Sequence, residues 1–237
     1  MKLTNNLWNL LYPARCPVCD KIVSPSGANI CFACRRKLRM IREPYCLKCG
    51  KPLQKEEQEY CLDCSSKKHI FISGTALYEY DSIQDSLYRF KYEGRQEYAA
   101  FFGEEMARYL GERIRKWNAD ALVPVPIHQR RMRERGYNQA QLLAEEIGAR
   151  LGIPVRSRLV GRIRNTLPQK GLGPEERQNN LKKAFKMYEN DVKLDTIIII
   201  DDIYTTGSTI DAVGNVLLEA GAKRIYFATL SIGRGLS

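Results

Sequence analysis

Eight cysteines are the first residues with evident chemistry, and all of them fall between positions 16 and 64. They form four pairs with two residues between partners, and the second set of four repeats the first at an offset of 30 residues. Such a repeat indicates two tandem copies of one small unit. Because paired thiolates from two tight turns complete a tetrahedral site, the spacing predicts two zinc ions. The expected ligand sets are Cys16, Cys19, Cys31 and Cys34 for one ion, and Cys46, Cys49, Cys61 and Cys64 for the other.

The residues alone leave other uses of these cysteines open. An interleaved arrangement would distribute the same thiolates differently between the two ions. Redox chemistry or an iron–sulfur cluster would also use thiols, although a redox motif is typically a single pair near a βαβ unit. Residues 1–15 lack the long apolar core of a secretory signal. We therefore expect a cytoplasmic protein with reduced thiols and structural zinc, because a closed four-cysteine site leaves no open coordination position.

The strongest catalytic-type signal is the segment TIIIIDDIYTTGST at 196–209. Its four isoleucines predict a parallel strand that is buried on both faces, with Asp201 and Asp202 at its carboxyl end. A helical pattern follows from about 208 to 220. A short loop that opens a helix offers backbone N–H groups, hydroxyls and the helix dipole to a phosphate. The expected phosphate-binding residues are Thr205, Thr206, Gly207, Ser208 and Thr209.

Two other nucleotide-binding patterns are absent from the sequence. The chain contains neither the G-x-x-x-x-G-K-[ST] loop of nucleoside triphosphatases nor the G-x-G-x-x-G turn of dinucleotide folds. The remaining structural alternative is that the two aspartates merely cap a turn, which four preceding buried isoleucines make a poor explanation.

Basic residues gather in the middle of the chain. The formal net charge is +11, and residues 128–186 carry 14 Lys or Arg against 5 Asp or Glu. Such a patch attracts the phosphates of a small ligand or of a nucleic acid, or is simply a solvated basic surface. A strand over 121–125, a basic loop over 127–137 and a helix over 139–151 would carry its first part. The candidate nucleic-acid contacts there are Arg130, Arg131 and Arg133, and Arg135 with Gly136 is placed to bind diphosphate oxygens.

Further elements position these groups. We expect a strand over 72–80 and helices over 82–91 and 97–117, and a glycine-rich basic stretch contains Gln169 and Arg177 as candidate functional residues. Phe90 and Tyr92 would stack on bases or, more commonly, pack in the core. The polar residues 65–69 suggest a boundary between a zinc module at 1–68 and an α/β domain at 69–237. No apolar run reaches the ~20 residues of a membrane-spanning helix, so we expect no membrane insertion.

The segment IIIIDDIYTTGST resembles the phosphoribosyl-diphosphate signature of type I phosphoribosyltransferases. With the upstream cysteines, Pro124-Val125-Pro126 and Arg135-Gly136-Tyr137-Asn138-Gln139, the whole chain resembles the ComF family. That family comprises competence-associated, phosphoribosyltransferase-like proteins with an N-terminal double zinc ribbon. The resemblance implies an α/β fold, in which a type I phosphoribosyltransferase-like parallel-sheet domain follows the zinc module.

The resemblance also implies roles for particular residues. Asp201 and Asp202 would be the catalytic pair that binds the ribose hydroxyls, and the loop at 205–209 would bind the 5′-phosphate. Gln169 and Arg177 would lie in the hood loop that closes over the site or binds the acceptor. Mg²⁺ would accompany phosphoribosyl diphosphate, whose diphosphate leaves C1′ through an oxocarbenium-like transition state.

Three functional hypotheses follow from these features. The first is a protein of the bacterial DNA-uptake system that binds phosphoribosyl diphosphate and single-stranded DNA, with partners such as a DNA-translocating helicase. The second is an active phosphoribosyltransferase in nucleotide salvage or synthesis. The third is a sensor in which phosphoribosyl diphosphate only switches a nucleic-acid-binding surface. Turnover separates the second from the third, and strand binding at moderate salt separates the first from the second.

Overall fold

A four-stranded parallel sheet organises the computed structural model, which describes residues 13–25, 27–164, 184–188 and 194–233. The strand order is β1, β6, β5, β2, and β3 pairs with β4 in a small antiparallel sheet. The strands are β1 (Ser73–Glu79), β2 (Ala121–Pro124), β3 (Val160–Arg162), β4 (Phe185–Met187), β5 (Thr196–Tyr204) and β6 (Arg224–Ile232). The helices are α2 (Phe32–Arg35), α3 (Leu62–Ser66), α4 (Tyr80–Tyr92), α5 (Tyr98–Lys116), α6 (Gln129–Arg135), α7 (Gln139–Leu151) and α9 (Ser208–Glu219).

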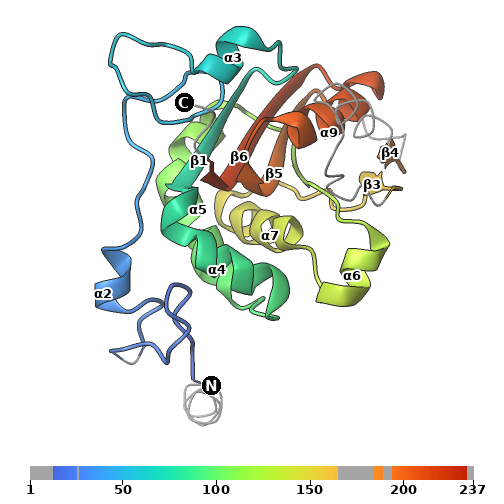
Figure 1. The fold of residues 1–237 in the computed structure, drawn as a ribbon. Coiled ribbons are helices and arrows are strands. Elements are labelled where there is room, and N and C mark those ends of the chain that lie inside the picture. The colour runs from blue at the N-terminus through green and yellow to red at the C-terminus, as the bar shows by residue number, and fades with distance from the viewer. Residues whose placement is uncertain (1–12, 26, 165–183, 189–193, 234–237) are drawn as a thin grey trace, which may run out of the picture.

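Helices cover both faces of the sheet (Figure 1). Helices α4, α5 and α7 lie on one face, while α9 lies on the other beside β3 and β4. The isoleucines of β5 divide between these two layers. Ile198 and Ile200 belong to the core with α5 and α7, whereas Ile197 and Ile199 belong to the core with α9. All four are fully buried, so the strand is buried on both faces as the sequence predicts.

Strand β5 continues past the acidic pair instead of ending at it. Its pairing with β6 runs on through Asp201, opposite Thr229, to Tyr204, opposite Ile232. The acidic side chains therefore project from an ordered strand, because β6 is long enough to extend the ladder. Helix α9 begins at Ser208, as the sequence predicts, and ends at Glu219.

The expected basic loop at 127–137 is mostly helical, which corrects the sequence-based expectation. His128 caps α6, accepting a hydrogen bond at Nδ1 from the Arg130 backbone N–H at 3.2 Å. Arg130 pairs with Glu134 one turn later, and Gly136 ends the helix in the left-handed conformation with φ of 78°. The short helix fixes the spacing of the arginines that it carries.

The two cysteine clusters lie against different parts of the α/β core. Cys16 is fully buried in the core cluster that includes Tyr98 and Phe102 of α5. Cys46 and Cys49 are buried in the cluster that includes Phe71 and Tyr204. The predicted domain boundary near residue 68 stays a prediction, but each half of the N-terminal segment has its own contact with the sheet or its helices.

Candidate functional site

The acidic pair lies at the carboxyl end of β5, where ligands of open α/β sheets gather. Asp202 forms an ion pair with Lys91, which lies in the last turn of α4. Asp201 accepts a hydrogen bond from the Asp202 backbone N–H at 2.9 Å. Ser231 of β6 donates to the Asp202 carbonyl at 3.1 Å, so both neighbouring elements hold the pair in place.

The electrostatics of the pair differ from those of surface carboxylates. Burial, followed by repulsion from Asp202, raises the pKa of Asp201 well above its usual range. Burial alone would lower the pKa of Lys91, but the carboxylates of Asp202 and Asp201 outweigh it and raise that pKa. Lys91 is therefore cationic, and the site holds one ion pair beside a carboxyl group that resists ionisation.

Basic side chains from two further elements surround the carboxylates. Burial, and then the charge of Arg131 on α6, lower the pKa of Arg162 on β3, while Asp201 acts in the opposite direction. Arg135 on α6 lies near Lys91 and holds its guanidinium 4.8 Å from the ring centre of Tyr92. Lys91, Arg131, Arg135 and Arg162 therefore form a positive rim around Asp201 and Asp202, suited to a polyanion with hydroxyl groups.

The predicted phosphate loop forms a small hollow at the start of α9. Residues from Ile203 to Ile210 line a cavity of about 20 Å³. Thr205 and Thr206 are exposed, and Thr206 Oγ1 lies 3.0 Å from Ser208 Oγ. Gly207 has φ of 77°, and a Cβ there would come within 2.7 Å of the Tyr204 hydroxyl. The loop thus combines exposed threonines with the amino end of a twelve-residue helix, the arrangement that binds phosphate.

Buried polar groups that sequence reasoning missed lie directly behind this loop. His69 Nδ1 is 2.7 Å from Asp211 Oδ2, and Asp211 Oδ1 accepts a hydrogen bond from the Ile70 backbone N–H at 3.1 Å. Burial, followed by the sulfurs of Cys49 and Cys64, raises the pKa of Tyr204, which therefore stays neutral. These contacts join residues far apart in sequence, so no local pattern could have revealed them.

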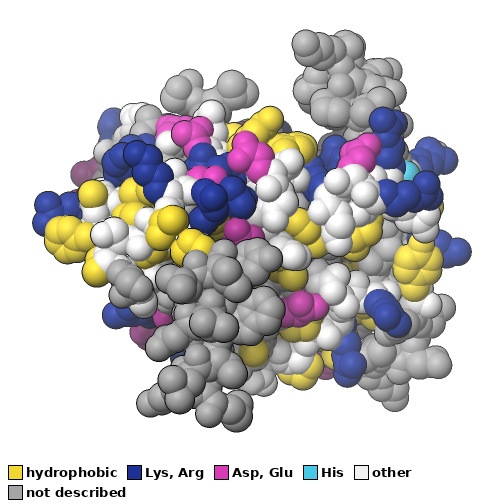
Figure 2. Space-filling view, turned by 90° about the horizontal axis from the view of Figure 1, so that it is seen from below, with side chains coloured by type: hydrophobic (Ala, Val, Ile, Leu, Met, Phe, Trp, Pro, Cys, Tyr) yellow, Lys and Arg dark blue, Asp and Glu magenta, His cyan; other side chains and the backbone are white. Residues whose placement is uncertain are grey.

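Exposed aromatic side chains continue the basic surface along α4. Tyr88 and Tyr92 are 58% and 62% exposed, and their ring centres lie 5.1 Å apart. In the view from below, Lys and Arg side chains gather toward α6 with hydrophobic side chains among them (Figure 2). Phe90, by contrast, is fully buried and packs in the core, the more common of its two expected roles, whereas Tyr92 is exposed.

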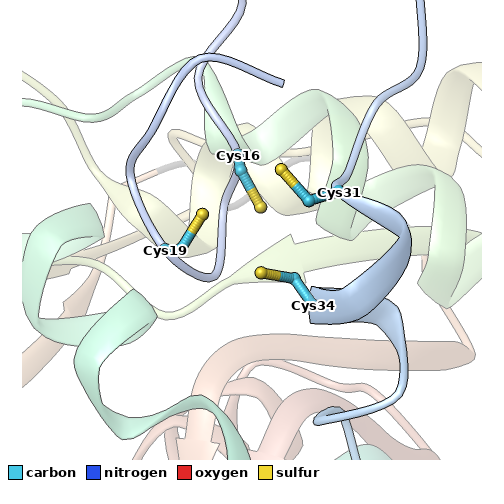
Figure 3. Close-up of side chains that lie close together, drawn as sticks. All are labelled: Cys16, Cys19, Cys31 and Cys34. Atoms are coloured by element: carbon cyan, nitrogen blue, oxygen red, sulfur yellow. The ribbon is translucent and has the colours of Figure 1, made fainter. Parts of the chain in front are cut away.

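The cysteines form two sequential clusters. In Figure 3 the sulfurs of Cys16, Cys19, Cys31 and Cys34 point toward one another from two turns. In each cluster all four sulfurs lie within 4.8 Å of one another, and Cys49 and Cys61 are 3.6 Å apart. Tetrahedral zinc with Zn–S bonds of ~2.3 Å requires sulfurs ~3.8 Å apart, so both clusters fit the ion. The ligand sets therefore follow the sequential pairing, and the interleaved alternative is wrong.

Other predicted site residues divide into three groups. Arg131 and Arg135 of α6 lie near the acidic pair, Arg130 and Arg133 are exposed on the same helix, and the loop at 205–209 directly follows the strand that carries the pair. Gly136 contributes its left-handed backbone conformation, with φ of 78°. A Cβ built there would meet nothing within 4 Å, so the space around it does not require glycine. Gln169 and Arg177 lie outside the described residues. Among the helices that the structure describes, none is both long enough and apolar enough to cross a membrane.

Two family models match different parts of the chain. Residues 7–65 match the double zinc ribbon domain, and residues 102–234 match the phosphoribosyl transferase domain. The second match covers more than half of the 237 residues.

Several curated relatives are similar over part of their length. Competence protein F of Haemophilus influenzae is 36% identical over 108 residues, which are 45% of this chain and 47% of that protein. DNA utilization protein YhgH of Escherichia coli is 39% identical over 106 residues, 45% of this chain and 46% of that protein. Competence protein ComFC of Bacillus subtilis is 32% identical over 155 residues, 62% of this chain and 58% of that protein. The chain thus spans about half the length of the curated relatives it matches.

One solved structure is distantly similar. A purine phosphoribosyltransferase from Pyrococcus horikoshii matches 58% of this chain and 83% of its own chain, with a TM-score of 0.36 and 16% identity. A likeness at this level carries no functional argument.

Proposed function

Because this chain belongs to the ComF family of phosphoribosyltransferase-like proteins with an N-terminal double zinc ribbon, we propose that it binds phosphoribosyl diphosphate and single-stranded DNA in bacterial DNA uptake. The observation that carries the proposal is the acidic pair, which lies between a positive rim and a helix-opening phosphate loop.

In this proposal, each group of residues binds one part of the ligand. Asp201 and Asp202 accept hydrogen bonds from the ribose hydroxyls, and the loop at 205–209 takes the 5′-phosphate through its N–H groups and hydroxyls. Arg131, Arg135 and Arg162 attract the diphosphate. Mg²⁺ bound with the ligand would neutralise the diphosphate charge. Lys91, through its ion pair with Asp202, would hold that carboxylate in place beside the ribose.

Calorimetric titration of the zinc-loaded protein with phosphoribosyl diphosphate and Mg²⁺ tests this site. Asp201→Ala combined with Asp202→Ala is expected to abolish binding while the fold remains. Asp195→Ala is the matched control, because Asp195 pairs with Lys223 on the exposed surface away from the site. Unchanged affinity in the double variant would rule out the proposed ligand site.

The surface of α4 and α6 supports the nucleic-acid part of the proposal. Exposed aromatic rings stack on bases, and arginines hold the phosphates between them. Tyr88, Tyr92 and Arg135 supply both kinds of group side by side. Arg130 and Arg133 are exposed on α6, the helix that also carries Arg135. A DNA strand bound to this surface would pass close to Asp201 and Asp202.

Salt-dependent binding of a fluorescent oligonucleotide separates the two kinds of contact. Replacing Arg130, Arg131 and Arg133 with Ala is expected to flatten the slope of affinity against salt, because fewer counterions are released. Tyr88→Ala with Tyr92→Ala should weaken binding by about 1–3 kcal/mol per lost base stack and leave the slope unchanged. Tyr109→Ala, at a tyrosine of α5 that is 46% exposed, is the control. An unaltered slope in the arginine variant would place the strand elsewhere.

The intact acidic pair and loop also favour a second candidate function, an active phosphoribosyltransferase. Diphosphate release in the presence of candidate acceptor bases distinguishes turnover from binding alone. If phosphoribosyl diphosphate binds, changes strand affinity and is never consumed, the protein is a sensor.

A further inference from the structure

The second cysteine cluster lies against the same residues that support the phosphate loop. The side chain of Lys51, only 4% exposed, forms an ion pair with Asp63, which lies between the ligands Cys61 and Cys64. Lys51 Nζ is also 5.9 Å from the ring centre of Tyr204. Tyr204 is the last residue of β5 and is followed directly by the loop.

Two backbone hydrogen-bonding contacts fix this zinc ribbon to the sheet. The Gly74 backbone N–H donates to the Lys48 carbonyl at 2.8 Å, and the Ser73 hydroxyl donates to the Leu47 carbonyl at 3.0 Å. A Cβ on Gly50 would lie 3.2 Å from the Gly74 carbonyl oxygen, so the ribbon and β1 approach closely. The ribbon cannot shift without moving β1 or breaking these contacts.

Tyr204 transmits this contact to the loop. Its ring stacks on Phe227 with centres 4.7 Å apart and planes within 1°, so the ring is fixed. Its hydroxyl is buried and has no hydrogen-bond partner among the described residues. Because a Cβ on Gly207 would lie 2.7 Å from this hydroxyl, Tyr204 forms the floor beneath the turn.

His69 and Asp211 make a second connection. The His69 side chain is 2% exposed, and its ring stacks on Phe71 with centres 4.9 Å apart. Its Nδ1–H donates to Asp211, whose own backbone N–H donates to the Gly207 carbonyl at 2.8 Å. A Cβ on Gly207 would lie 2.8 Å from His69 Cε1. The pair therefore anchors the loop to the segment that leaves the second ribbon.

We propose that His69, Asp211 and Tyr204 are positioning residues through which the second zinc ribbon holds the loop at 205–209 in its phosphate-binding form. This inference rests on the proposed function for the identity of the ligand, but the mechanical coupling stands on the contacts alone. Loss of the ion held by Cys46, Cys49, Cys61 and Cys64 loosens the loop and weakens binding of a sugar 5′-phosphate.

The first ribbon provides an internal comparison, because its contacts lead to other elements. Asp20 accepts hydrogen bonds from Arg95, at 2.8 Å, and from Tyr98 of α5, at 2.5 Å. Arg35 pairs with Glu105 of α5 at 3.1 Å. A ligand substitution in the first ribbon therefore disturbs α5 and leaves the loop in place.

Matched cysteine variants test the coupling. Cys61→Ser and Cys31→Ser each remove one ligand from one cluster, and zinc content is measured for both. Hydrogen exchange of a peptide covering residues 203–211 is expected to rise in Cys61→Ser and to match the wild type in Cys31→Ser. Affinity for ribose 5-phosphate, a probe without diphosphate, should fall about tenfold or more in Cys61→Ser alone. Equal exchange and equal affinity in both variants would overturn the proposal.

Variants at His69 keep the test valid if a cysteine variant fails to fold. His69→Leu removes the hydrogen bond to Asp211 but fills the space, and it should retain both zinc ions. Exchange at 203–211 should rise, and ribose 5-phosphate affinity should fall about tenfold, the scale of one hydrogen bond to a charged group. His69→Asn, which can restore a donor near the Nδ1 position, should recover part of both losses. Wild-type exchange in His69→Leu would contradict the proposed role.

The two readouts separate this inference from the proposed function. If the wild type binds neither ribose 5-phosphate nor phosphoribosyl diphosphate, the proposed ligand is wrong. In that case, raised exchange at 203–211 in Cys61→Ser and His69→Leu, but not in Cys31→Ser, still supports the coupling. Unchanged exchange in all three variants overturns it.

Discussion

At the scale of single residues, the ion pair between Lys91 and Asp202 lies directly beside Asp201 and affects its ionisation. Lys91 pairs with Asp202, while burial and the neighbouring charge of Asp202 raise the pKa of Asp201 even though Lys91 acts in the opposite direction. Ionising Asp201 in the folded protein therefore carries an electrostatic cost. In the proposed function, ribose hydroxyls and Mg²⁺ would offset this cost.

This cost predicts a pH-dependent gain in stability for Asp201→Asn. The raised pKa means that the folded wild type binds more protons than the unfolded chain, so its stability falls as pH rises. The loss begins near the ordinary carboxyl pKa of 3.8 and continues up to the raised value. Asn cannot ionise, so the urea midpoint of the variant should exceed that of the wild type increasingly over this window. A constant difference between the two proteins at all pH values would contradict this account.

At the scale of elements, helix α6 places the arginines and depends on how it ends. Seven residues are too few for a stable isolated helix, so its caps matter. His128 caps its start, and Gly136 ends it with a left-handed backbone that costs other residues energy.

Substitutions at Gly136 should separate backbone from side-chain effects. Gly136→Ala is expected to destabilise the protein by about 1 kcal/mol, because Ala adopts the left-handed region poorly. Gly136→Asn should lose less, since Asn tolerates that region. Urea unfolding of both variants at constant zinc content measures the difference. Equal losses of unfolding free energy would mean that the C-terminal end of α6 rearranges in both variants.

At the scale of the whole molecule, the first ribbon is attached to the α/β core through Asp20. This residue has φ of 59° and accepts hydrogen bonds from Arg95 and Tyr98. Burial alone would raise the pKa of Asp20, but these partners outweigh it and lower that pKa.

Asp20→Asn tests this attachment. Asn keeps the left-handed backbone but loses the charge that pairs with Arg95, so we expect a loss of about 1–2 kcal/mol in unfolding free energy. Hydrogen exchange should rise in residues 13–40 and stay unchanged at 203–211. A rise at both places would mean that the two ribbons move together.

Local sequence patterns predicted those parts of the molecule whose functional residues lie close together in the chain. The cysteine repeat predicted two ligand clusters, and four isoleucines before two aspartates predicted a buried strand that delivers carboxylates. The His69–Asp211 contact joins residues 142 positions apart, and the ion pair of Lys91 with Asp202 also joins distant parts of the chain. Such contacts depend on how helices and ribbons pack on the sheet, which no spacing in the sequence encodes. Helix α6 was mistaken for a loop because its seven residues are almost all polar.

Strand β1 pairs only with β6 in the main sheet, and these strands lie about 150 residues apart in the chain. A ribosome therefore completes both ribbons long before it makes the strand that β1 pairs with. The thiolates can bind zinc early. Cys46 and Cys49, which share a core cluster with Phe71, are not covered until Tyr204 and Phe227 have been synthesised. Contacts of such long sequence separation fold slowly. During synthesis, the zinc-bound turns can therefore fold first, and their apolar side stays exposed to solvent until β6 has been made.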